Sequence, residues 1–263
     1  MSKYISLEGL SAFLAKLKES QGSSTPSFGG LVLSPGAVYW DDMACEVYMD
    51  SDWYFSETYQ GRPADAGWDT HFFSFETARD NILGNTFDGG WRIPSENEWK
   101  TILGLDENPR AGATVNGESG AHWLYVNVDI SNESFNMFGK SSIDGLIIFP
   151  DNVTITRTWI DTSCINDNPM GSASEYGLSV EEIGSLISEG CAFLPVLGYW
   201  WDEGGGMFIG EEEYMMYMAS EWMVDSGSGA STVYMDMSMD EAPSIYTVNE
   251  YEDYIAVRLV RDA

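Results

Sequence analysis

The chain has 263 residues, of which 44% are hydrophobic and 14% aromatic, and its 42 Asp and Glu against 12 Lys and Arg give a formal net charge of −30. That much apolar sequence can bury a substantial core, which argues against disorder of the whole chain. Nucleic acids and anionic membrane surfaces attract clustered Lys and Arg, so the charge argues against both as partners. Solubility is the simplest role for the carboxylates, with Ca²⁺ or a cationic partner as the alternative.

The first 20 residues predict a short amphipathic helix, because Leu7, Leu10, Leu14 and Leu17 recur at helical spacing. A helix this short is marginal alone, so the stripe either docks on the main domain or associates with copies of itself. Residues 21–30, QGSSTPSFGG, have the composition of a linker. The sequence therefore predicts an attachment or oligomerisation helix over 1–20, a linker over 21–30 and one domain over 31–263.

The same N-terminus lacks the continuous apolar core of a signal peptide, and no stretch reaches the ~20 apolar residues that span a bilayer. We therefore expect no signal peptide, no membrane insertion and assembly in the cytoplasm.

After residue 31 the chain consists of short apolar runs separated by Gly, Asn, Asp and Ser. Four of these runs are rich in β-branched and aromatic residues and predict strands: LVLSPGAVYW, HWLYVNVDI, DGLIIFP and NVTITRTWI. Helices are predicted after Ser95, from Ser179 to about Ser188, and near Phe75–Leu83. The closing stretches STVYMDMSMD and YIAVRLV alternate, which predicts half-buried antiparallel strands, with Ile255, Val257 and Leu259 on one face. The fold class predicted is α+β.

The stretch GGWRIPSENEW, residues 89–99, predicts a strand that stops and a capped helix that starts. Pro94 cannot continue a strand ladder, and Ser95 with Glu98 three residues later forms the pattern of a capping box. Trp91 and Trp99 bring large apolar groups to this corner, and Arg92 is expected in a structural ion pair. The motif therefore predicts scaffold and no catalysis.

GWRIPSENEW also resembles the G-W-R-[LI]-P-[TS]-x-x-E-[WF] element of bacterial and phage C-type-lectin-like domains. These include the Fibrobacter-type major paralogous domain, the formylglycine-generating (sulfatase-modifying) domain and the variable proteins of diversity-generating retroelements. Downstream, CAFLPVLGYWWDEGG, YMASEWMVD and AVRLVRD resemble later segments of the same family, in the same order. The resemblance implies a C-type-lectin-like fold over 31–263, with antiparallel strands and two or three helices. Such a fold hosts enzymes, lectins and adaptable binders, so it does not fix the function.

KYISLEGLSAFLAKLK, near the N-terminus, resembles the openings of structural or tail proteins of gut bacteriophages. The two resemblances together imply a phage receptor-binding or tail-tip protein, carried on the virion. Its expected partners are a host cell-surface protein or glycan, other phage structural proteins, and further copies of the chain.

The family resemblance implies a ligand face near the C-terminus, where Tyr and Trp offer contact area with few rotamers to freeze and Asn and Asp offer adaptable hydrogen bonds. In retroelement-diversified members, mutation at Asn-type codons produces Tyr, Asp, Asn and Ser at such positions. Strand alternation requires Trp200 or Trp201 to point inward, so part of this set is expected in the core. The candidate ligand-binding residues are Tyr199, Trp200, Trp201, Asp202, Glu203, Trp222, Tyr246, Asn249, Tyr251, Asp253 and Tyr254.

An enzyme of the formylglycine-generating type is the alternative. That activity uses a pair of cysteines close to the C-terminus, whereas 72 residues without cysteine follow Cys191 here. His71 and His122 are the only histidines, and their spacing supports no hydrolytic triad. We therefore expect a non-enzymatic protein without catalytic residues; a bacterial surface adhesin domain is a further alternative.

No cofactor or metal site is predicted, because HExxH and EF-hand patterns are absent. The Glu-Pro-Asn, Gln-Pro-Asp and Trp-Asn-Asp signatures of Ca²⁺-dependent lectins are absent as well. Ca²⁺ on acidic runs such as Glu211–Glu213 is the alternative. Cys45, Cys164 and Cys191 lack metal-ligand or redox spacing, which favours buried thiols and leaves one disulfide open.

Overall fold

A computed structural model describes residues 25–41, 46–49, 72–73, 78, 89–105, 109–131, 142–167, 177–196, 199–201, 207–209, 214–223, 229–236, 242–248 and 253–263. The α-helices in this part are α3 (Glu96–Leu103) and α4 (Val180–Ser188), and a 3-10 turn spans Thr162–Cys164. The strands are β1 (Leu31–Asp41), β2 (Glu46–Met49), β3 (Phe72–Phe73), β4 (Ala113–Val115), β5 (Glu118–Ala121), β6 (Trp123–Asp129), β7 (Ser142–Ile148), β8 (Thr154–Ile155), β9 (Gly177–Ser179), β10 (Ala192–Pro195), β11 (Tyr199–Trp201), β12 (Met207–Ile209), β13 (Tyr214–Met223), β14 (Gly229–Asp236), β15 (Ser244–Val248), β16 (Asp253–Ala256) and β17 (Arg258–Asp262). The fold class is α+β, as the sequence predicts.

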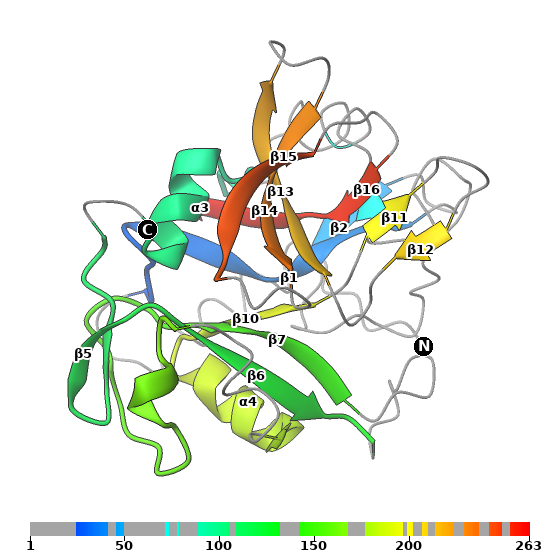
Figure 1. The fold of residues 1–263 in the computed structure, drawn as a ribbon. Helices are drawn as coiled ribbons and strands as arrows, with labels where there is room; N and C mark the ends of the chain where they lie inside the picture. The colour runs from blue at the N-terminus through cyan, green and yellow to red at the C-terminus, as the bar shows by residue number, and fades with distance from the viewer. Residues whose placement is uncertain are drawn as a thin grey trace.

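Four sheets organise these strands (Figure 1). The first has the order β17-β1-β2, the second β10-β7-β6-β9, the third β12-β11-β16-β13-β14-β15 with β3 beside β16, and the fourth β5-β4-β8. Most pairs are antiparallel, but β6 with β9, β4 with β8 and β13 with β16 run parallel. The first and last described strands, β1 and β17, pair antiparallel, so the two ends of the described chain lie side by side.

The sheet β10-β7-β6-β9 separates two hydrophobic cores. Along β6, Trp123 and Tyr125 face the core that also contains Trp99 and Tyr217, whereas Leu124, Val126 and Val128 face the core beneath α4. Figure 1 shows α4 against this sheet, on the side away from α3. A sheet buried on both faces has few polar positions, which explains why HWLYVNVDI and DGLIIFP are almost continuously apolar.

Both described helices begin with a complete capping box. The Ser95 side chain accepts from the Glu98 N–H while the Glu98 carboxylate accepts from the Ser95 N–H, and Ser179 and Glu182 do the same for α4. These bonds satisfy N–H groups that the first turn of a helix leaves without partners. The predicted starts of both helices are therefore confirmed. The helix predicted near 75–83 lies outside the described residues except for Ala78, which is helical and buried.

The prediction that NVTITRTWI is a strand is wrong for most of its length. Only Thr154 and Ile155 pair, because their neighbour β4 ends at Val115. Beyond them Asn116 replaces the ladder, since its side-chain amide donates to the carbonyls of Arg157 and Ile160 and its oxygen accepts from the Arg157 N–H. These three hydrogen bonds of the Asn116 side chain help to hold residues 157–160 in an irregular conformation.

The prediction that YIAVRLV is half-buried is also wrong. It divides into β16 and β17 at Val257, and residues 255–260 are all buried. Arg258, which occupies a polar position of the alternation, is 1% exposed, and its guanidinium donates to the carbonyls of Ser34 and Pro35. Both faces of this segment are buried, so alternation does not report exposure here.

Candidate functional site

The predicted ligand-binding residues that the structure describes lie on the sheet that contains β11, β16, β13, β14 and β15. β11 and β16 pair antiparallel, with Trp200 opposite Tyr254 and Trp201 opposite Asp253. Directly opposed residues of antiparallel strands have Cα atoms about 4.5–5.5 Å apart. Two stretches about 50 residues apart in the chain are thus neighbours at one end of this sheet (Figure 1).

Two other predicted residues lie elsewhere on the same sheet. Tyr246 of β15 is opposite Thr232 of β14, and Trp222 of β13 is opposite Ala230. The register of β13 with β16 places Ala256 beside Tyr217, so Tyr254 falls in the row of Met215, seven residues from Trp222. At about 3.3 Å per residue this is roughly 20 Å along the strand. The sheet therefore brings Trp200 and Trp201 next to Tyr254 and Asp253. It holds Trp222 at a distance from that group. Asp202, Glu203, Asn249 and Tyr251 lie outside the described residues.

The strand β13 is braced by the corner motif. Its pairing with β14 shifts register between Met218 and Trp222, which marks a bulge in this strand. The Trp99 indole N–H donates to the Met218 carbonyl at 3.0 Å, and the Ser220 N–H donates to the Pro94 carbonyl at 2.9 Å. These two hydrogen bonds fasten the turn at Pro94 and the helix α3 to the bulge of β13.

The corner is also fastened to the last strand. The backbone N–H groups of Arg92 and Val260 donate to each other's carbonyls at 2.9 and 2.8 Å. The Arg92 guanidinium pairs with Glu98 at 2.6 Å and with Asp262 at 3.1 Å. The hydrogen bond with Glu98 raises the pKa of Arg92. Burial alone would raise the pKa of Glu98, but Arg92 and Ser95 outweigh it and lower that pKa. Trp91, 1% exposed, lies beneath the Arg261 guanidinium at 4.9 Å.

A buried polar centre joins α3, the start of β6 and the turn after β7. The Arg110 guanidinium donates to Asp151 at 2.9 Å and to the carbonyls of Ile102 and His122 at 2.9 and 3.1 Å. The Asp151 carboxylate also accepts from the backbone N–H groups of Gly29 and Gly112 at 2.6 and 2.9 Å. Burial would raise the pKa of Asp151, but these hydrogen bonds and the Arg110 charge lower it.

His122 packs against this centre with a nitrogen that makes no hydrogen bond. The residue is 8% exposed, and its Nδ1 is buried without a partner. Burial and the neighbouring Arg110 charge lower the pKa of His122, so the neutral imidazole is favoured. A Cβ at Gly104 would lie 2.5 Å from the ring, and Gly104 has φ 67°, so only glycine fits there. The arrangement is structural packing.

Within the described part, the thiols and carboxylates form no reactive constellation. Cys164 and Cys191 are free, and burial raises the pKa of the Cys191 thiol. No group of three or more His, Cys, Asp or Glu in the described ranges could hold a metal ion. None of the helices described is long and apolar enough to cross a bilayer. Cys45 lies outside the described residues.

Comparisons with protein-family models, with curated proteins and with solved structures each returned no match.

Sequence reasoning missed the buried centre because its members carry no local signal. Arg110 follows Asn-Pro and Asp151 follows Phe-Pro, 41 residues later, in stretches that read as ordinary turns. The second capping box was readable, since Ser179-Val-Glu-Glu182 has the same spacing as Ser95–Glu98.

Proposed function

We propose that this chain is a non-enzymatic ligand-binding protein whose residues 31–263 form a C-type-lectin-like domain. The observation that carries the proposal is the antiparallel pairing of β11 with β16, which sets Tyr199–Trp201 beside Asp253–Tyr254. Tyr and Trp are residue types that offer aromatic contact area with few rotamers to freeze, and Asp is one that offers hydrogen-bonding groups. This pair of strands forms the centre of the proposed face.

The arrangement of the family-like segments supports the proposed domain. The GWRIPSENEW corner pairs with the terminal VRLV strand through Arg92 and Val260. It also donates a hydrogen bond to, and accepts one from, the strand that carries the YMASEWM segment. Segments that resemble one family in sequence are thus neighbours in space.

The same resemblances suggest the setting. In the proposal the protein belongs to a bacteriophage tail, reaches the virion after cytoplasmic assembly, and recognises a host cell-surface protein or glycan without a cofactor. A bacterial surface adhesin would use the same face, so the two settings differ in what carries the domain.

The enzyme alternative needs accessible cysteines. Burial raises the pKa of the Cys191 thiol, which leaves little of the thiolate that acts as nucleophile or metal ligand. In addition, 72 residues without cysteine follow Cys191, where the formylglycine-generating enzymes carry their pair, and this favours the binding proposal. Oxidation of a cysteine-containing sulfatase peptide by the purified full chain, followed by mass spectrometry, would overturn it.

The proposed face is tested with fluorescently labelled full chain on intact strains of gut bacteria and on a glycan array. Changing both Tyr251 and Tyr254 to Ala should reduce capture at least about 10-fold, since buried aromatic anchors contribute more than 1 kcal/mol each. Tyr246→Ala, on β15 at the other edge of the sheet, tests how far the face extends, and Glu118→Ala on β5 serves as the neutral control.

Thermal melts must show that each variant is folded. Unchanged capture by the folded double variant would refute the proposed centre. An equal loss from Tyr246→Ala would instead extend the face across the sheet.

A further inference from the structure

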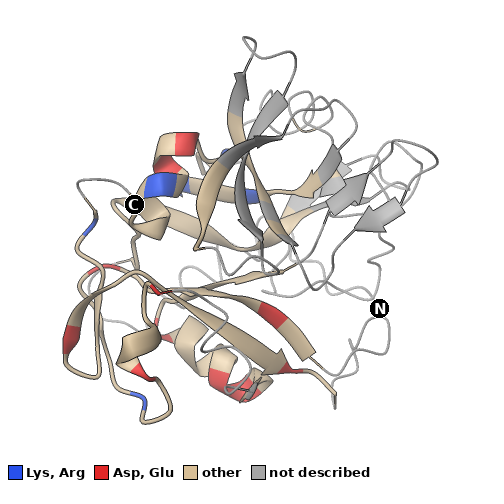
Figure 2. Ribbon diagram, in the orientation of Figure 1, with Lys and Arg blue, Asp and Glu red and all other residues tan. Residues whose placement is uncertain are grey.

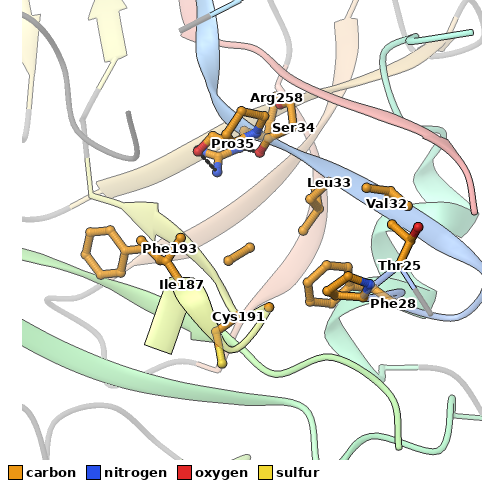
Figure 3. Close-up of a pocket in the computed structure, with 13 residues that line it drawn as sticks. Thr25, Phe28, Val32, Leu33, Ser34, Pro35, Ile187, Cys191, Phe193 and Arg258 are labelled. Atoms are coloured by element: carbon orange, nitrogen blue, oxygen red, sulfur yellow. Dashed lines mark hydrogen bonds between the residues drawn. The ribbon is translucent and has the colours of Figure 1, made fainter. Parts of the chain in front are cut away.

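A small apolar pocket lies where the N-terminal segment joins the domain. It has a volume of about 70 Å³ and lies between β1, the end of α4 and the start of β10. Figure 3 shows Phe28, Leu33, Ile187 and Phe193 around it, with Arg258 at one end. Small-molecule sites usually measure ~300–1,000 Å³, and a dry cavity of ~150 Å³ already admits benzene. A pocket of this size fits one aliphatic side chain.

The chain enters the described part at the rim of this pocket. Thr25 and Pro26 both line it. The entry is fixed, because the Asp151 N–H donates to the Ser27 carbonyl at 2.8 Å and the Phe28 N–H to the Leu31 carbonyl at 2.7 Å. Pro26 also packs on Gly190, where an added Cβ would lie 2.5 Å from the proline ring. Whatever precedes Thr25 therefore starts beside the pocket.

The segment that precedes Thr25 carries the leucine stripe. Leu17 is eight residues from Thr25, and Leu14 is one helical turn earlier. A flexible stretch of eight residues has an r.m.s. length of about 14–17 Å. A short tether of this kind gives a local concentration in the millimolar range, which favours the chain's own pocket over that of a second copy.

Charge favours the same contact. Residues 1–24 contain three of the 12 basic residues and only two of the 42 acidic ones. The rest of the chain holds 40 of the 42 acidic residues and nine of the 12 basic ones. The helix α4, whose last turn lines the pocket, carries Glu181 and Glu182 in its first turn, and Figure 2 shows acidic residues on this helix. A lysine-bearing segment is attracted to such a surface, most strongly at low ionic strength.

We propose that residues 1–24 dock on their own domain, with Leu14 or Leu17 filling the pocket between β1 and α4. The leucine stripe is then covered within one chain and is not the contact between copies. This inference is independent of the proposed ligand face, which lies on another sheet.

The test places the photo-cross-linker p-benzoylphenylalanine in the full chain at position 14 or 17. Irradiation at low micromolar concentration should yield cross-links within one chain, and mass spectrometry should map them to residues 25–35 or 187–193. Position 16 lies off the stripe and is the matched control, where the yield should be at least about five-fold lower. Thr25→Trp, which fills the pocket mouth from a half-buried position, should lower the yield from position 17.

Cross-linked dimers as the main product would identify a second copy as the occupant and overturn the proposal. Cross-links to other parts of the domain, or equal yields from positions 16 and 17, would overturn it as well. Thr25→Trp is a change at the rim, so a folded variant that leaves the yield unchanged also counts against it.

Discussion

At the scale of single residues, Asp151 has the strongest predicted effect on stability. Its partner Arg110 has a side chain that is 1% exposed, so Asp151→Asn leaves a buried guanidinium without its counter-charge. Removing one partner of a buried ion pair typically costs about 3–5 kcal/mol. Urea unfolding of the full chain should show a loss in this range.

Glu96→Gln is the matched control for that experiment. Glu96 pairs with Lys100 one turn along α3, and both side chains are about one third exposed. Such i,i+4 surface pairs contribute about 0.3–0.5 kcal/mol. Equal losses from Asp151→Asn and Glu96→Gln would contradict a buried, charge-balanced centre.

His122 predicts how stability depends on pH. Its pKa is lowered by burial and by Arg110, so the unfolded chain, with an ordinary pKa of about 6.5, takes up the proton at higher pH than the folded one. The contribution of His122 to the free energy of unfolding is therefore complete above pH ~6.5 and declines as pH falls through that value. Each pK unit of lowering corresponds to about 1.4 kcal/mol.

An NMR titration of the His122 ring in the folded protein measures this directly. If the measured pKa is below 6.5, the contribution of His122 to the unfolding free energy should be smaller at pH 5.5 than at pH 7.5. A pKa at or above ~6.5 would show that the imidazole is better solvated, or better paired, than its buried Nδ1 indicates.

At the scale of elements, the brace between α3 and β13 is the contact to test. Trp99→Phe keeps most of the ring packing but removes the donor to the Met218 carbonyl, which is buried. Leaving a buried acceptor unsatisfied costs about 1–3 kcal/mol. We expect this loss in unfolding free energy, together with faster amide hydrogen exchange in β13.

Trp91→Phe provides the comparison, because it changes the same corner and leaves both hydrogen bonds to β13 in place. Faster exchange in β13 in both variants would mean that corner packing, rather than the indole hydrogen bond, holds the bulge.

At the scale of the whole molecule, the net charge of −30 predicts a response to salt. Like charges repel one another more in the compact state, and salt screens this repulsion. The melting temperature should rise by several degrees between 10 and 200 mM NaCl, since ~1 kcal/mol corresponds to about 2–4 °C in a protein of this size.

Choline chloride at the same ionic strength should raise the melting temperature by the same amount as NaCl. A larger rise with CaCl₂ at matched ionic strength would indicate that carboxylates bind Ca²⁺. A melting temperature that is flat or falls in NaCl would contradict the repulsion argument.

Sequence patterns locate an element well when the interactions that define it join residues close together in the chain. Ser95 and Ser179 mark helix starts because a capping box involves residues three positions apart. The apolar runs of β6 and β7 mark strands because both faces of their sheet are buried. Patterns failed at residues 156–160, which lie beyond the end of the neighbouring strand β4, and at Arg258, which is buried and donates to the carbonyls of Ser34 and Pro35.

For the candidate face, the sequence alone determined which residue types gather near the C-terminus, because composition is a property of the chain. Only the tertiary structure decided that Trp200 lies opposite Tyr254 while Trp222 lies roughly 20 Å away along β13. It likewise decided that Arg110 meets Asp151 and that Trp99 braces the bulge of β13. Strand register and buried pairing depend on contacts between residues dozens of positions apart, and no local pattern encodes them.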